Sequence, residues 1–199
     1  MSPKRKEKSR ESLLAAARKL FWKYGIRKVT VDEICREAEV SKMTFYRYFE
    51  NKIELAALML IEVYENALQD YNNIMHSEHP FPEKIRQVVL LKHRGTTEIS
   101  EEFLSDVYQS KEPVIQELLT KYSKISGKVL RDDFAKAQKE GWIRKDLKID
   151  FLMYMMDSIG ERLFDEKLKE MFGNTHDLVM SLTNFFFYGI GTADKPLTQ

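Results

Sequence analysis

The sequence contains little cysteine, glycine or proline. Cys35 is the only cysteine among 199 residues, which excludes a disulfide scaffold, and eight glycines and five prolines leave few interruptions between secondary-structure elements. No apolar run reaches the roughly 18 to 20 residues that cross a bilayer, and the opening MSPKRKEKSRES lacks the apolar centre of a secretory signal. We therefore expect a cytoplasmic protein without a membrane-spanning segment.

Patterns typical of catalysis or metal binding are also missing. There is no glycine-rich phosphate loop, nucleophile elbow or cysteine–histidine arrangement, and Cys35 falls on an apolar helix face where it acts as a small core residue. The four histidines are scattered, and the pair at 76 and 79 lacks an evident acidic or cysteine partner. We expect no enzyme activity, no metal site and no cofactor.

The net charge of +1 conceals an asymmetry along the chain. Residues 1–60 contain 14 Lys and Arg against 8 Asp and Glu, a formal charge of +6, whereas residues 61–199 carry −5. Such a division predicts a basic N-terminal part that meets a polyanion and a larger acidic part with a different role. The segment PKRKEKSR at the start could touch nucleic acid, but we expect a solvated, disordered tail.

Helical periodicity dominates, and strand alternation is scarce. Apolar residues recur at spacings of three and four from Leu13 to Tyr24, and Gly25 is positioned to end that helix in a left-handed conformation. Further helices are predicted near 30–38, 41–49, 51–75, 82–94, 98–109, 112–139, 150–172 and 175–190, with a short polar tail after Gly191. The pattern predicts an all-α protein.

The second and third predicted helices have helix-turn-helix spacing. Thr30 and Glu33 form a capping-box pattern at the start of the second helix, and Ser41 can cap a third helix that ends near Phe49. A turn of about three residues joins them. Asn51 and Glu54 then form a similar pair at the start of a long fourth helix.

The stretch SKMTFYRYFENK, residues 41–52, divides into two faces at 100° per residue. If Phe45 and Phe49 point to the core, Arg47 and Met43 point away from it. Thr44 and Tyr46 flank the outward face, and Lys42 and Tyr48 lie at its margins. Such cationic, aromatic and hydroxyl groups suit the base edges, thymine methyls and phosphates of a B-form major groove.

Two helix N-termini border this third helix. Lys52 lies at the start of the fourth helix and Thr30 at the start of the second, where the helix dipole favours an anion. Phosphates on either side of the groove could occupy both positions. The pattern therefore predicts a short helix that reads double-stranded DNA between two phosphate-binding helix ends.

Residues 9–60 resemble the DNA-binding domain of the tetracycline-repressor (TetR) family. The matching motifs are AA..LF...G in the first helix, TV.EI...A.VS in the second, and TFY.YF.NK..L across the third and the start of the fourth. Two positions differ: Glu39 replaces the usual glycine before VS, and Met43 replaces the usual small residue before Thr44. The resemblance covers about a quarter of the chain.

The resemblance implies an N-terminal helix-turn-helix DNA-binding domain, residues 1–52, and a larger helical effector-binding and dimerisation domain, residues 53–199. It implies a transcriptional regulator, with repression favoured over activation because occupying a promoter needs no further contact with polymerase. Carried over by position, phosphate contacts fall to Thr30, Tyr46, Tyr48 and Lys52. Contacts with base edges or methyl groups fall to Lys42, Met43 and Thr44, with Arg47 as a further candidate.

The C-terminal region predicts a homodimer. Phe185, Phe186, Phe187 and Tyr188 follow one another, so on a helix they cover every direction, and one domain can cover only part of that surface. A two-fold axis through the last two helices would match a palindromic operator. The aromatic and methionine content between them suits an apolar or aromatic small-molecule effector.

A helical adaptor that binds another protein or an acidic surface through its basic N-terminal end is the alternative. It would need no groove-fitting helix pair, and it predicts weak, nonselective attraction to DNA. Sequence-selective DNA binding would exclude it.

Overall fold

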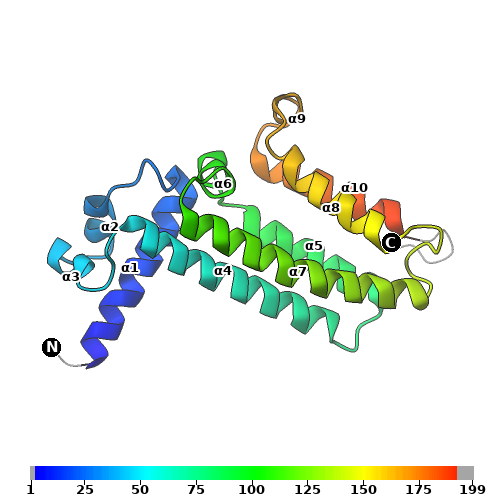
Figure 1. Cartoon of the computed structure of the whole chain (residues 1–199), viewed down its shortest axis with the longest axis horizontal. Coiled ribbons are helices and arrows are strands. Elements are labelled where there is room, and N and C mark those ends of the chain that lie inside the picture. Colours follow the sequence, from blue (N-terminus) through cyan, green and yellow to red (C-terminus); the bar gives the residue numbers. More distant parts are fainter. Residues whose placement is uncertain (1–2, 192–199) are drawn as a thin grey trace. The chain divides into compact units, whose positions relative to one another are not determined.

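The computed structural model describes residues 3–191, with side chains from residue 7 onward. In this part of the chain there are ten α-helices and no strand (Figure 1). The helices are α1 Pro3–Tyr24, α2 Val31–Glu37, α3 Lys42–Tyr46, α4 Lys52–Met75, α5 Phe81–Thr96, α6 Glu101–Tyr108, α7 Pro113–Lys139, α8 Ile149–Arg162, α9 Glu166–Glu170 and α10 Thr175–Ile190. The all-α prediction is confirmed. The polar tail expected after Gly191 lies outside the described residues.

Some predicted boundaries are wrong. Helix α1 begins at Pro3, so the expected disordered tail is helical from that residue. Helix α3 ends at Tyr46, three residues before Phe49. The helix predicted at 150–172 is two helices, because the Asp165 side chain accepts hydrogen bonds from the backbone N–H groups of Lys167 and Leu168 and so caps a new helix.

The chain forms two compact units. The first contains the residues up to Asn66 together with Glu98–Lys121, and the second contains Ala67–Thr97 and the residues from Tyr122 onward. Two of the three boundaries fall inside long helices, α4 and α7, and the third lies between α5 and α6. The first unit therefore includes α6 and the start of α7 in addition to the helix-turn-helix region. The functional division at residue 52 stays a prediction.

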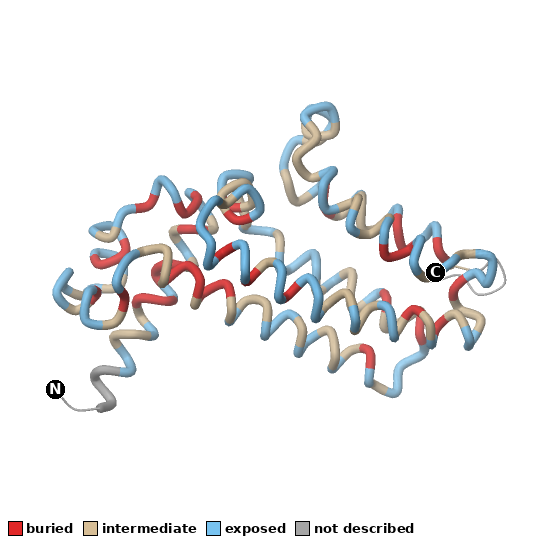
Figure 2. The backbone as a smooth tube through the Cα atoms, in the orientation of Figure 1, coloured by how far each residue is buried: buried red, intermediate tan, exposed pale blue. Residues whose placement is uncertain are grey.

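The core of the first unit is built on α1 and the first turns of α4. Leu13, Ala17 and Phe21 on α1 are fully buried, which confirms the predicted apolar stripe, although Tyr24 at its end is 45% exposed. The first three turns of α4 are buried on several sides (Figure 2), at Leu55, Ala56, Ala57, Met59 and Leu60. Helix α2 packs against α1, and α3 packs against α2.

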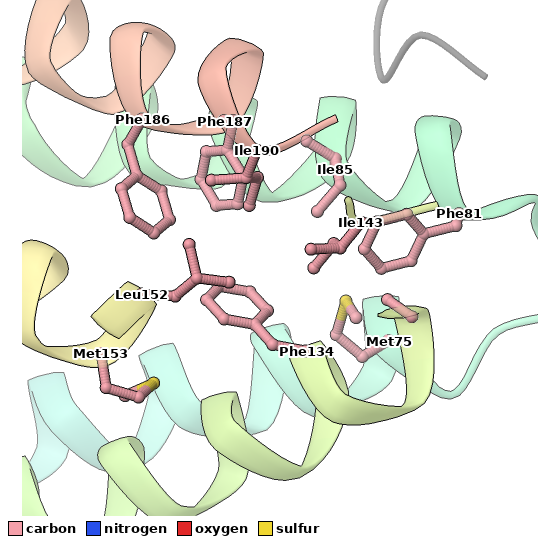
Figure 3. Close-up of a cluster of buried hydrophobic side chains, with 11 residues drawn as sticks. Met75, Phe81, Ile85, Phe134, Ile143, Leu152, Met153, Phe186, Phe187 and Ile190 are labelled. Atoms are coloured by element: carbon pink, nitrogen blue, oxygen red, sulfur yellow. The ribbon is translucent and has the colours of Figure 1, made fainter. Parts of the chain in front are cut away.

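The core of the second unit gathers apolar side chains from α5, α7, α8, α10 and the end of α4 (Figure 3). Its fully buried members include Ile85, Phe134 and Leu152. Helix α10 also contributes Phe186, Phe187 and Ile190, and it packs against α5. The second unit therefore has a hydrophobic core of its own.

Candidate nucleic-acid interface

Helix α3 has one buried face and one exposed face. Phe45 and Phe49 are 0% and 1% exposed, whereas Met43 is 82% and Tyr46 57% exposed. Arg47, at the C-terminal cap of α3, is also exposed. The predicted orientation of the aromatic anchors and of Met43 and Arg47 is therefore confirmed.

Local bonds fix the orientation of α3. The Ser41 hydroxyl accepts a hydrogen bond from the backbone N–H of Thr44 at 3.2 Å, which is the predicted N-cap. The Phe45 ring packs against the Tyr46 and Phe49 rings, with centroids 5.3 and 5.6 Å away. A five-residue helix is too short to be stable alone, so these contacts hold it in place.

The turn between α2 and α3 contains an unfavourable backbone conformation. Glu39 has φ of +53°, the left-handed region in which glycine costs least. The backbone N–H of Val40 then donates to the carbonyl of Cys35 at 3.0 Å and closes the turn. Glu39 therefore occupies a glycine-like conformation at the position where the sequence already departs from the family motif.

The aromatic and basic side chains that follow α3 lie together. The Arg47 guanidinium carbon lies 5.0 Å from the centre of the Tyr48 ring, and Arg47 Nη2 donates to the Tyr48 hydroxyl at 3.4 Å. Tyr48 in turn packs on Phe49 at 6.2 Å. Stacking restricts the Arg47 side chain at the end of the outward face.

Lys42 and Thr44 each have a partner beside the outward face. The Lys42 ammonium lies 2.6 Å from the Asp32 carboxylate of α2. The Thr44 hydroxyl lies 3.0 Å from the Ser41 hydroxyl and is half-buried. Sequence reasoning selected Lys42 but missed Asp32, because a surface carboxylate on a helix face has no local signature.

Thr30 forms the predicted capping box with Glu33. The Thr30 backbone N–H and hydroxyl both donate to the Glu33 carboxylate at 2.8 Å, and the Glu33 N–H donates to the Thr30 hydroxyl at 3.3 Å. These hydrogen bonds from Thr30 lower the pKa of Glu33 below its usual value. The proton of the Thr30 hydroxyl is therefore directed to Glu33, and the predicted phosphate contact of Thr30 stays a prediction.

Lys52 has different contacts from those expected of a phosphate ligand. Its ammonium donates to the backbone carbonyls of Ile26, Arg27 and Val29, each at 2.8 Å. Burial lowers the pKa of Lys52, while the charges of Asp106 and Glu33 act in the opposite direction. An ammonium has three N–H donors, and here all three are used by the loop between α1 and α2. Lys52 therefore holds that loop to the start of α4.

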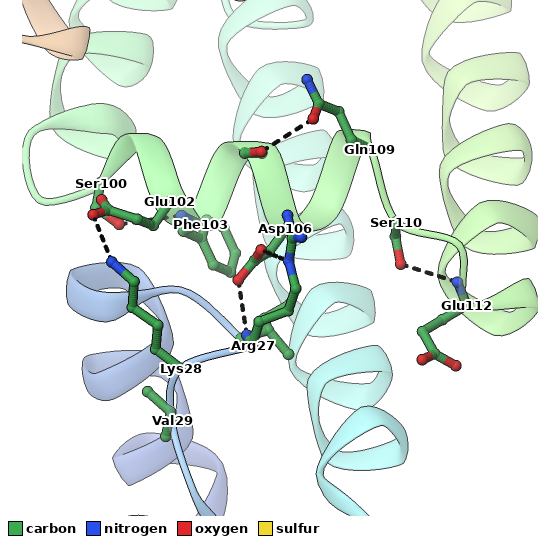
Figure 4. Close-up of polar contacts among 12 residues, drawn as sticks. Arg27, Lys28, Val29, Ser100, Glu102, Phe103, Asp106, Gln109, Ser110 and Glu112 are labelled. Carbon is green, nitrogen blue, oxygen red and sulfur yellow. Dashed lines mark hydrogen bonds and ion pairs between the residues drawn. The ribbon is translucent and has the colours of Figure 1, made fainter.

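The same loop is attached to α6 by charged side chains (Figure 4). The Arg27 guanidinium pairs with one carboxylate oxygen of Asp106. The other carboxylate oxygen accepts a hydrogen bond from the backbone N–H of Arg27 at 2.8 Å. Lys28 pairs with Glu102 at 3.1 Å. The partners lie more than 70 residues apart in sequence, so no local pattern could have identified them.

Gly25 makes the close approach of α6 possible. Its φ is +82°, which confirms the predicted left-handed end of α1, and an added Cβ would lie 2.7 Å from Asp106 Oδ2 and 3.0 Å from the Glu102 side chain. Glycine is therefore required here for two reasons: the backbone conformation and the nearby side chains.

Neither a metal-binding cluster nor a membrane-spanning helix is present in the described part of the chain. Between residues 7 and 191 the structure contains no group of three or more His, Cys, Asp or Glu side chains that could hold a metal ion. Within the same described region, no helix has both the length and the apolar character needed to span a bilayer.

The fold and this outward face define a helix-turn-helix protein, and comparisons with known proteins agree. Residues 13–59 match the family described as "Bacterial regulatory proteins, tetR family". The chain is 24% identical over 134 residues to an uncharacterized HTH-type transcriptional regulator, YhgD, of Bacillus subtilis, covering 66% of this chain and 70% of that protein. It is 21% identical over 173 residues to the probable acrEF/envCD operon repressor of Escherichia coli K12, covering 83% and 79% respectively.

The fold also resembles a solved structure of a putative transcriptional regulator from Saccharomonospora viridis in complex with choline. The TM-score is 0.75 at 18% identity, over 94% of this chain and 99% of that one. Together with the family match, these findings support a TetR-family transcriptional regulator. The two curated relatives are described as a transcriptional regulator and a probable operon repressor.

Proposed function

We propose that the protein is a repressor that binds a palindromic DNA operator as a homodimer and leaves it when a small molecule binds. The observation that carries this proposal is the outward face of α3, where Met43, Tyr46 and Arg47 are exposed over the buried Phe45 and Phe49. Repression is supported by the similarity to a probable operon repressor. Such a protein would act in the cytoplasm, where bacterial chromosomal DNA lies.

In this proposal α3 lies in the major groove. Lys42, Met43, Thr44 and Arg47 face base edges and thymine methyl groups, while Tyr46 and Tyr48 reach phosphates beside the groove. Thr30 contributes the N-terminus of α2 as a phosphate site. Lys52 contributes indirectly, because its ammonium holds the Ile26–Val29 loop in place beside the start of α4.

The proposed dimer forms through α8 and α10. On α10, Phe185 and Tyr188 are 77% and 61% exposed, and on α8, Phe151 and Tyr154 are 50% and 70% exposed. Large aromatic side chains exposed on two neighbouring segments mark a surface for association. Because a single α3 makes few base contacts, a two-fold pair of them supplies the specificity of a palindromic site.

The proposed effector is a small apolar or aromatic molecule bound by the region 53–199. Tyr71 packs against the apolar core of the second unit and has Asp133 as a polar neighbour. Burial and the nearby Asp133 raise the pKa of the Tyr71 hydroxyl. Asp133 Oδ2 is itself buried without a hydrogen-bond partner. A carboxylate oxygen in this condition favours a ligand that carries a positive charge. The cation choline is bound in the similar structure from Saccharomonospora viridis.

Effector binding can release DNA only through a difference between two shapes of the protein. A ligand lowers operator affinity to the extent that it binds the DNA-incompetent shape more tightly. In this proposal, residues 1–52 bind DNA and residues 53–199 bind the effector and form the dimer.

Selection of random duplex DNA by the purified full-length protein tests the proposed function. The expected product is an inverted repeat whose half-sites are separated by about one helical turn, or 10 to 10.5 base pairs. Recovery of a single unrepeated site would contradict the dimeric arrangement. Failure to enrich any sequence would contradict operator binding and favour a helical adaptor with a basic surface.

A further inference from the structure

The ion pair between Lys42 and Asp32 places a negative charge beside the proposed DNA-reading face. Lys42 is the first residue of α3 and Asp32 lies in the first turn of α2. Their charged atoms are 2.6 Å apart, and the side chains remain 59% and 54% exposed. Both groups are therefore accessible to a ligand that approaches α3 from solvent.

The helix dipoles explain why these two residues pair. A lysine at a helix N-terminus opposes the dipole, whereas an aspartate in a first turn is favoured by it. Asp32 thus supplies the negative charge that the start of α3 lacks. An exposed pair of this kind contributes little to stability, so its main effect is on the charge that approaching DNA meets.

Asp32 has opposite consequences for specific and nonspecific DNA. Nonspecific binding comes almost entirely from cations that neutralise phosphates, and a carboxylate paired with Lys42 cancels one such cation and repels nearby phosphates. At the correct sequence, Lys42 can exchange the carboxylate for base-edge acceptors such as guanine O6 and N7. The cost of separating the pair is then offset only where those acceptors are present.

We propose that Asp32 is a specificity-determining residue that competes with DNA for the Lys42 ammonium and so weakens binding to nonspecific sequences. This inference rests on the proposed DNA-binding function. It assigns to a carboxylate outside α3 a role in discriminating the operator from other DNA.

The test compares Asp32→Asn with Glu37→Gln in the full-length protein. Both variants remove one negative charge from α2, and Glu37 pairs at 2.6 Å with Lys19 of α1 instead of a residue of α3. Dissociation constants are measured by fluorescence anisotropy, over a range of salt concentrations, for a random-sequence duplex and for the operator obtained by selection. Thermal unfolding checks that both variants are folded.

Asp32→Asn is expected to tighten binding to the random duplex by about three- to tenfold and to steepen the salt slope by about one ion, because Lys42 becomes free to neutralise a phosphate. Operator affinity should change by about twofold or less, so that the ratio of operator to random-duplex affinity falls. Glu37→Gln should change the affinity for the random duplex and the affinity for the operator by the same small factor. Equal effects of the two variants on the random duplex would overturn the proposal.

A second comparison tests whether Asp32 acts through Lys42. In a Lys42→Gln background, the gain from Asp32→Asn on random DNA should shrink to the gain given by Glu37→Gln. Persistence of the full gain would show simple repulsion and would overturn the competition for Lys42. If the wild-type protein binds neither DNA, the proposed function itself fails, which is a separate result from failure of the Asp32 proposal.

Discussion

Single residues in and directly after α3 decide which of its faces is exposed. Phe45 and Phe49 are buried and Met43 is 82% exposed, as helical periodicity alone predicted. The partners of charged residues could not be predicted in this way. Lys52 binds carbonyls 23 to 26 residues away, and Lys42 pairs with Asp32 on another helix. Such contacts depend on how a loop folds back, and no periodic pattern describes that.

Replacing Glu39 with glycine should stabilise the protein. Glu39 has φ of +53°, which is unfavourable for a residue with a Cβ, and glycine removes this strain at some cost in backbone entropy. We expect Glu39→Gly to raise the free energy of unfolding by about 0.5 to 1 kcal/mol, as measured by urea denaturation. Lower stability than wild type would contradict the assigned backbone conformation.

Replacing Lys52 with methionine should destabilise the protein. Methionine keeps the aliphatic length but leaves the carbonyls of Ile26, Arg27 and Val29 without their ammonium donor. We expect the free energy of unfolding to fall by about 2 kcal/mol, again measured by urea denaturation. A variant with unchanged stability whose DNA salt slope drops by about one ion would show that Lys52 serves as a phosphate ligand instead.

At the scale of elements, caps and glycine determine where helices begin and end. The capping box at Thr30, the Ser41 cap and the Gly25 stop were all predictable from their own sequence neighbourhoods. The early end of α3 and the separation of α8 from α9 were not. Residues 163–165 are compatible with a continuous helix in composition, and the break depends on the Asp165 side chain turning toward the next backbone N–H groups.

The contact between α6 and the loop after α1 depends on Gly25. Alanine at this position would combine a φ of +82° with a Cβ 2.7 Å from Asp106 Oδ2. We expect Gly25→Ala to lower the free energy of unfolding by about 2 kcal/mol or more, since the left-handed conformation alone costs roughly 1 to 2 kcal/mol.

A matched glycine provides the control. Gly95 lies inside α5 with nothing within 4 Å of an added Cβ. Gly95→Ala should therefore raise the free energy of unfolding by about 0.5 to 1 kcal/mol. Equal changes in the two variants would contradict the special role of Gly25. Urea denaturation measures both.

At the scale of the whole molecule, aromatic residues on α10 are divided between the core and the surface. Phe186 and Phe187 are buried in the second unit, whereas Phe185 and Tyr188 are exposed. The run of four aromatics predicted this division in principle, but which pair faces inward depends on how α10 packs against α5. The exposed pair is the surface that we propose for dimerisation.

Replacing Phe185 with glutamate should produce a monomer. A charge at the centre of an apolar interface is buried on association without a partner, at a cost that a small dimer interface cannot offset. Sedimentation velocity at about 10 micromolar protein should give a dimer for wild type and a monomer for Phe185→Glu. Val114→Glu, at a position 41% exposed on α7, should remain dimeric. A monomeric wild type would contradict the proposed dimer.

The proposed effector site should distinguish charge in a matched pair of ligands. The 2-phenylethylammonium ion should bind about tenfold more tightly than neutral 2-phenylethanol, because its N–H groups can pair with Asp133 Oδ2. Isothermal titration calorimetry measures both affinities, and Asp133→Asn should remove the difference. Equal affinities in the wild-type protein would contradict a role for Asp133 in ligand selection.

The proposed function depends above all on the outward face of α3 reading base edges. The most direct test repeats the selection of random duplex DNA with Met43→Ala and Arg47→Gln variants and compares their half-sites with that of the wild type. We expect each variant to keep the inverted repeat and to relax its preference at one or two positions of each half-site, at about 1 to 3 kcal/mol per lost base contact. An unchanged consensus for both variants would contradict it.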